Sequence, residues 1–224
     1  MNTDDPGAAL AREVSEQLRV LADAGLVAGI VESRSPGKPV LGIRIPPLRD
    51  AVRQGLKNHR PQPADAVRAA ERLWFGESHE QELAAAMMLR LTAAAYDPDL
   101  VGRWAVNLDN WLSVDELGGW VAAAVAGGEV DPQAITPLAA ADSPWQRRLY
   151  VVSLITVLRG DLDPAKVPEL IALCHDRAKP VRMAVAWLIK DVLKWRPAAA
   201  GLFLDATDRP YPAPVLRLLE RVPA

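Results

Sequence analysis

The chain has 224 residues, half of them hydrophobic, and a formal net charge of −2. Its single cysteine, Cys174, excludes an intrachain disulfide, a thiolate metal site and an iron–sulfur cluster, as is typical of a protein of the reducing cytoplasm. No uncharged apolar run approaches the length of a membrane span, and the acidic start MNTDDPGAAL does not resemble a signal peptide, so we expect a cytoplasmic protein with no membrane partner.

The first half of the sequence predicts a series of helices separated by proline and glycine. An amphipathic helix is predicted from about residue 7 to residue 24, ending at Gly25, and the stretch SRSPGKPVLGIRIPP is predicted as a loop. Pro46 and Pro47 suit the first turn of a helix that continues to about Asn58, and Ser78 suits the N-cap of a later one. Further helices are predicted over 65–75, 79–97, 98–107 and 111–126.

The second half continues the pattern, with helices predicted over 132–141, 144–159, 164–174, 180–195 and 212–221. The segments SPWQRRLYVVSLITVLRG and KPVRMAVAWLIKDVLKWRP form a weak repeat, because their prolines, Pro144 and Pro180, are 36 residues apart. The best strand candidate, VLGIRI, is flanked by proline on both sides. The sequence therefore predicts one all-α domain over 1–224, a HEAT-like repeat solenoid with a concave groove.

Charge is segregated along the chain. Residues 1–141 carry 13 basic and 19 acidic side chains, whereas residues 142–196 carry ten basic and six acidic ones. A second basic segment, from Arg34 to Arg60, has seven Lys and Arg residues against one Asp. Such segments indicate a nucleic-acid surface or, more simply, solvated helix faces.

Four side chains in the C-terminal half are candidates for a binding or catalytic site. Trp111 and Asp115 are four residues apart and share one face of a predicted helix, Arg148 closes the run WQRR, and Trp187 lies in the last long helix. Taken singly, each has a structural explanation: a packing indole, a carboxylate near a helix start, an inter-helix ion pair and a core indole. Seven Trp beside three Tyr and two Phe are nevertheless more indoles than a core of this size requires.

In combination, these segments resemble a known family. WLSVD, DSPWQRRLYVV and KPVRMAVAWLIKDVLKWRP are similar, in this order, to signature segments of the HEAT-like repeat DNA alkylation repair glycosylases, the AlkD-like family. The earlier GIRIPPLRDAVR and LWFGESHEQELAAAMML also resemble segments of that family, so the likeness covers about residues 40–200. No single segment is specific, but five in the same order are.

The resemblance implies a role for each candidate residue. Asp115 corresponds to the catalytic carboxylate of the family, Trp111 and Trp187 to its two signature indoles, and Arg148 to the arginine of its W-x-x-R segment. The chain departs from the family pattern at four nearby positions: Leu112, Ala186, Lys190 and Asp191. Leu112, which stands in place of an Asp, removes a polar side chain but leaves the main carboxylate.

The implied reaction is hydrolysis of the N-glycosidic bond of N3- or N7-alkylated purines in duplex DNA. An alkylated purine is cationic and leaves readily, so Asp115 would stabilise the oxocarbenium-like sugar and orient a water. Trp111 and Trp187 would hold the damaged base through stacking and cation–π contacts, and Arg148 would bind a neighbouring phosphate. No cofactor or metal is expected, and the enzyme would act as a monomer, associated with the nucleoid when bound to DNA.

Two other functions remain open from the sequence: a non-catalytic binder of unusual DNA structures with the same fold, and a HEAT-like protein–protein scaffold.

Other kinds of catalytic site have weaker support in the sequence. The three histidines, at 59, 79 and 175, lack metal-ligand spacing, and the chain contains neither a phosphate-binding P-loop motif nor a G-x-S-x-G nucleophile elbow. Cys174 is expected to be buried and inert.

Overall fold

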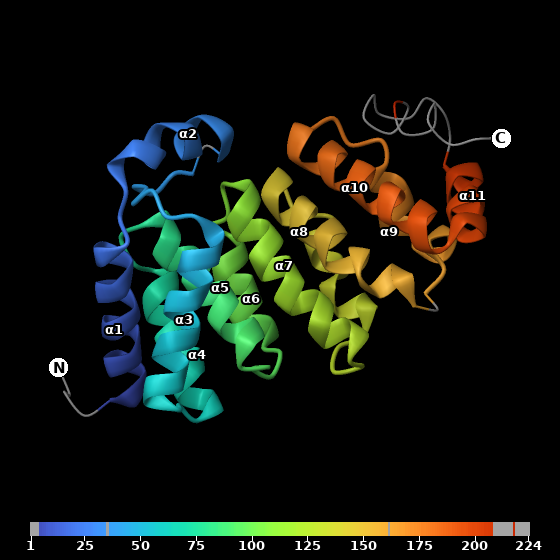
Figure 1. The fold of residues 1–224 in the computed structure, drawn as a ribbon. Helices are drawn as coiled ribbons and strands as arrows, with labels where there is room; N and C mark the ends of the chain where they lie inside the picture. The colour runs from blue at the N-terminus through green and yellow to red at the C-terminus, as the bar shows by residue number, and fades with distance from the viewer. Residues whose placement is uncertain (1–4, 35, 161, 208–216, 218–224) are drawn as a thin grey trace. The chain divides into compact units, whose positions relative to one another are not determined.

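The computed structural model describes residues 5–34, 36–160, 162–207 and 217, and its regular elements there are all helical, with no strand (Figure 1). The all-α class predicted from the sequence is therefore confirmed for the described residues. The chain divides into two compact units, Met1–Trp120 and Val121–Ala224, called here unit 1 and unit 2. The boundary between them falls within one helix.

Unit 1 is built from six helices and the start of a seventh. They are α1 (Pro6–Val20), α2 (Ala24–Arg34), α3 (Ile45–His59), α4 (Pro63–Trp74), α5 (His79–Leu91), α6 (Pro98–Ala105) and α7 (Trp111–Ala126). The core forms where α1 packs on α3 and α4, and where α5 packs on the same two helices. Its centre includes the fully buried indoles of Trp74 and Trp104, which stack with ring centroids 4.3 Å apart.

Unit 2 contains the helices of the sequence repeat. Its elements after α7 are η1 (Pro132–Leu138), α8 (Pro144–Ile155), η2 (Val157–Arg159), η3 (Pro164–Lys166), α9 (Pro168–Leu173), α10 (Lys179–Trp195) and α11 (Pro197–Ala206). The two repeated segments form α8 and α10, and these helices pack against each other. The internal repeat therefore corresponds to a helix pair that buries a shared apolar face, as in helical repeat proteins.

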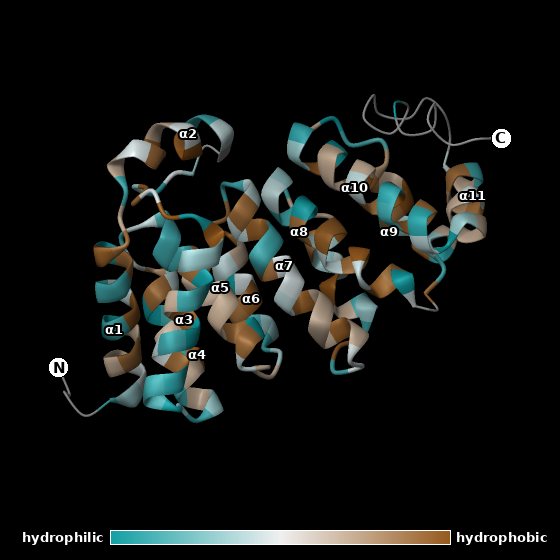
Figure 2. Ribbon diagram, in the orientation of Figure 1, coloured by the Kyte–Doolittle hydropathy of each residue, from teal (hydrophilic) through white to brown (hydrophobic). Residues whose placement is uncertain are grey.

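Local signals explain where most of these helices begin. Ser78 caps α5 in a capping box, because its hydroxyl accepts from the Gln81 amide while the Gln81 side chain accepts from the Ser78 amide. Pro46 and Pro47 lie in the first turn of α3, where a missing N–H costs nothing. In Figure 2 the ribbon of α1 alternates between hydrophobic and hydrophilic residues, as expected for a helix with one buried face.

The structure corrects several predicted boundaries. The first helix ends at Val20, and Gly25 does not terminate it; Gly25 instead lies in the first turn of α2, where the Asp23 carboxylate accepts a hydrogen bond from its amide. The segment predicted as a helix over 132–141 is a 3-10 helix ending at Leu138, with Pro137 inside it.

Three other stretches can be compared with the sequence analysis. The VLGIRI stretch is predicted as part of a loop, and residues 40–44 are irregular as expected, although α3 already begins at Ile45. Helix α11 was not predicted, although Pro197 stands at its first position. The helix predicted over 212–221 lies outside the described residues except for Arg217, which is helical.

Candidate functional site

The start of α7, which carries Trp111 and Asp115, is held by a group of buried polar side chains. Asn110 precedes the helix, and its Oδ1 accepts from the Ser113 amide at 2.9 Å while its Nδ2 donates to Ser113 Oγ at 3.0 Å. This is the N-cap arrangement, which satisfies a backbone donor that has no partner inside the helix. Asn110 and Ser113 are both buried, so the first turn of α7 is fixed from within unit 1.

The buried carboxylate of Glu82 connects this cap to α5. Glu82 Oε1 lies 3.5 Å from Asn110 Nδ2, and Glu82 Oε2 lies 3.1 Å from Lys38 Nζ. Burial raises the pKa of Glu82 above its ordinary value, against the opposing effects of Ser113 and Lys38. An acid of this kind is tolerated in a core only when it is paired and hydrogen-bonded, so the group has a defined geometry.

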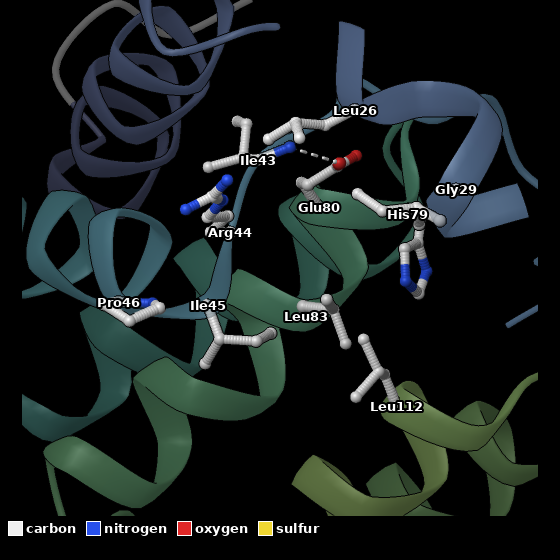
Figure 3. A pocket seen from close by; sticks show the side chains of 11 residues that line it. Leu26, Gly29, Ile43, Arg44, Ile45, Pro46, His79, Glu80, Leu83 and Leu112 are labelled. Atoms are coloured by element: carbon white, nitrogen blue, oxygen red, sulfur yellow. Dashed lines mark hydrogen bonds between the residues drawn. The ribbon is translucent and has the colours of Figure 1, made fainter. Parts of the chain in front are cut away.

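The irregular segment 36–44 is attached to the same part of unit 1. Glu80 accepts hydrogen bonds from three consecutive amides, those of Leu41, Gly42 and Ile43, at 2.9–3.1 Å. Figure 3 shows the bond from Ile43. Gly42 has a positive φ of 86°, and a Cβ there would approach the Asp23 carbonyl oxygen to 2.0 Å, so no other residue fits without a shift. These residues of the GIRI and ESHE segments thus have a structural role.

Trp111 and Asp115 lie one turn apart on one face of α7, and both side chains are partly exposed. Their neighbours Val114 and Leu117 are fully buried. The helix therefore presents the indole and the carboxylate at its partly exposed side, on a backbone that the core of unit 1 and the Asn110 cap hold in place.

The other two candidate residues lie in unit 2. Arg148, on α8, is only 4% exposed, and its Nη1 donates to the Pro180 carbonyl of α10 at 3.0 Å. Trp187, on α10, is 42% exposed even though Val185, Ala186 and Leu188 around it are buried. The two pairs of candidate residues belong to different units, so their convergence on one groove remains a prediction.

The seven tryptophans divide by location. Trp74, Trp104 and Trp120 are buried in unit 1, where the Trp120 indole donates to the Ala94 carbonyl at 3.0 Å. The other four are at least partly exposed: Trp111, Trp145, Trp187 and Trp195. The two indoles predicted to hold a base therefore lie outside the buried group, which is the location that a ligand contact needs.

A separate apolar pocket lies beside the first turn of α7. Leu112 lines it together with Leu26 and Ile30 of α2 and with Leu83 of α5, and it has a volume of about 380 Å³. In the close-up of Figure 3, Leu83 and Leu112 lie on the same side of the pocket. The lining includes neither Trp111 nor Asp115. Because this side of the first turn faces apolar side chains, leucine suits position 112, where the family resemblance implied an aspartate.

Comparison with known proteins identifies the family. A family model described as DNA alkylation repair enzyme matches residues 14–218. The chain belongs to this family. Among solved structures it is similar to a predicted DNA alkylation repair enzyme from Enterococcus faecalis, with 15% sequence identity and a TM-score of 0.71 over 89% of this chain and 95% of the other. That likeness shows the shared helical fold, and none of the curated proteins matches the sequence.

Two structural findings bear on other functional classes. No described helix is both long enough and apolar enough to cross a membrane. Within the described part of the chain, no group of three or more His, Cys, Asp or Glu residues is placed to hold a metal ion. Cys174 is buried as predicted, and burial raises the pKa of its thiol to about 12.

The residues that hold the start of α7 in place were not singled out from the sequence. Asn110 carried a usable signal, because an Asn immediately before a predicted helix favours an N-cap. Glu82 and Lys38 carried none, because they are 28 and 72 residues before Asn110. Glu82 contacts Asn110, and Lys38 contacts Glu82, only in the folded chain.

Proposed function

We propose that this DNA alkylation repair family member is a monofunctional DNA glycosylase that hydrolyses the N-glycosidic bond of cationic N3- or N7-alkylated purines in duplex DNA. The observation that carries the proposal is the stripe formed by Trp111 and Asp115 on α7, where an indole and a carboxylate are partly exposed on a firmly held helix. The family match supplies the DNA substrate class.

The proposed chemistry assigns the reaction to Asp115. As the bond between sugar and base breaks, positive charge develops on the sugar, and a fixed carboxylate lowers the energy of that charge more than water does. Asp115 also orients the water that attacks the sugar carbon. The cationic base leaves without a general acid, and the proposed reaction needs no cofactor.

The indoles and the arginine provide binding. Trp187 has an exposed ring portion that can lie against a cationic base, and Trp111 offers a second indole one turn from Asp115. Arg148 donates a hydrogen bond to the Pro180 carbonyl of α10, which orients its guanidinium, and we assign this cation to a phosphate of the duplex. These roles require the two units to present their residues to the same duplex.

The test is Asp115→Asn, assayed on duplex DNA with one N7-alkylguanine, followed by alkaline cleavage at abasic sites. The variant keeps the side-chain volume but loses the charge, so excision should fall about a hundredfold or more while folding and DNA binding are retained. Wild-type excision by the variant would refute the assignment.

The same assay separates the alternative functions. A wild-type protein that binds DNA but excises nothing would be the non-catalytic binder of unusual DNA structures. A wild-type protein that neither excises the lesion nor binds DNA would be a HEAT-like protein–protein scaffold.

A further inference from the structure

Two arginines from different helices of unit 1 approach one carboxylate next to Asp115. Arg49 Nη2, on α3, lies 3.9 Å from Glu116 Oε1, and Arg90 Nη1, on α5, lies 3.7 Å from Glu116 Oε2. The arginine side chains are 34% and 47% exposed, whereas the Glu116 side chain is 14% exposed. Two accessible cations therefore share a single, largely buried anion.

These contacts differ from the other arginine pairs of unit 1. Arg72 donates a hydrogen bond of 2.8 Å to Asp5, which is a closely matched pair. Among the described residues, no hydrogen bond joins Arg49 or Arg90 to an acceptor, and Glu116 Oε2 is buried without a hydrogen-bond partner. Burial raises the pKa of Glu116 despite the two arginines, as expected for distant partners.

The Arg90 side chain, from α5, also lies against the face of α7 that carries Trp111 and Asp115. A Cβ added at Gly119 would come within 3.0 Å of Arg90 Nη1, so the guanidinium lies directly over this glycine. Gly119 follows Asp115 by four residues and Trp111 by eight, which places all three on one face. Four residues of a helix rise about 6 Å, so Gly119, the position under the guanidinium, is about one turn from Asp115.

We infer that Arg49 and Arg90 form a binding site for a phosphate of the DNA backbone next to the lesion. Glu116 holds the two guanidiniums in place without using their hydrogen-bond donors, and a guanidinium with open donors binds phosphate in a bidentate manner. Two arginines against one carboxylate leave a net positive charge for the phosphate. This inference rests on the proposed action on DNA and extends the binding surface to residues of α3 and α5.

The experiment measures the affinity of the full chain for an undamaged fluorescent duplex over about 50–200 mM salt. The variants are Arg49→Gln and Arg90→Gln, and the matched control is Arg72→Gln, whose side chain is 50% exposed but already hydrogen-bonded to Asp5. Each site variant should lower the slope of log affinity against log salt by about 0.9, the value for one phosphate contact. The control should leave the slope unchanged.

Two further measurements distinguish binding from a structural role. Single-turnover excision measured over a range of DNA concentrations should need more DNA for half-saturation in both site variants than in the wild type, because a phosphate contact contributes to DNA binding. Glu116→Gln should raise DNA affinity more than the exposed-carboxylate control Glu77→Gln, because it removes the negative charge that lies beside both guanidiniums.

The outcomes also separate this inference from the proposed function. Unchanged salt slopes in Arg49→Gln and Arg90→Gln, in a wild-type protein that excises the lesion, would overturn the phosphate site alone. A Glu116→Gln variant that melts at lower temperature with no gain in affinity over Glu77→Gln would overturn it too. A wild-type protein that neither binds duplex DNA nor excises the lesion would overturn both.

Discussion

Replacing Trp187 by alanine tests whether this indole binds a ligand or fills the core. A fully buried Trp→Ala change costs about 3–5 kcal/mol. Trp187 is 42% exposed, so slightly more than half of its surface is buried. Scaling the cost by the buried share gives a loss of roughly 2–3 kcal/mol in the free energy of unfolding. Denaturant unfolding measures this value, and Trp74→Ala, at a fully buried indole, should show the full loss.

The functional part of this prediction is a difference between two lesions. A cation–π contact is worth about 0.5–2 kcal/mol, which corresponds to roughly a twofold to thirtyfold loss of excision for a cationic base. A neutral lesion in the same duplex lacks the ring charge, so Trp187→Ala should reduce its excision less. Single-turnover rates on the two duplexes give the comparison.

Trp195→Ala is the matched control on the same helix. Trp195 is 55% exposed, and its ring is covered by Arg159 at 5.6 Å and Lys194 at 4.8 Å. Its loss should lower stability by a similar or smaller amount and leave excision at the wild-type rate. Equal losses on both lesions in Trp187→Ala, with a fall in stability as large as that of Trp74→Ala, would refute the ligand role and assign Trp187 to packing.

Two other predictions concern Arg148 and Glu82. Arg148→Ala should weaken binding to damaged and undamaged DNA alike and reduce the salt slope by about one phosphate contact; an unchanged slope with a lower melting temperature would make Arg148 a structural link between α8 and α10. For Glu82, burial raises the pKa in the folded chain, so the stability it contributes is present below the ordinary value of 4.5 and is lost as the pH rises through the folded pKa. The stability advantage of the wild type over Glu82→Gln should therefore fall with rising pH in denaturant unfolding at a series of pH values; an advantage that grows over this range would contradict the reasoning.

Much of the fold follows from local sequence signals. The start of α5 was predictable because Ser78 offers a cap oxygen three residues before Gln81, and the start of α3 because prolines suit a first turn. The bounds of α7, Trp111–Ala126, agree with the predicted range. In each case the decisive interaction lies within a few residues along the chain.

Prediction from sequence failed where the deciding contact was ambiguous or distant. Gly25 has the form of a helix stop, but the Asp23 carboxylate accepts from its amide and α2 begins there instead. For Trp187 the sequence left both a core position and a ligand-binding position open, and the indole is 42% exposed although Val185 and Leu188 are buried. The contacts of Glu116 with two other helices depend on tertiary packing, which no local pattern encodes.

The carboxylates of α5 and α7 illustrate what separates a supporting residue from a candidate for catalysis. Glu80 and Glu82 are buried, and their oxygens are occupied by three backbone amides and by Lys38 and Asn110, so they hold the chain in place. Asp115 is partly exposed on the helix that this group positions. A carboxylate can stabilise a developing sugar cation only if the substrate reaches it and if its own position is fixed beforehand. In this chain partial exposure distinguishes Asp115 from the buried Glu80 and Glu82. The buried Glu82, through the Asn110 cap, helps to fix the helix that carries Asp115.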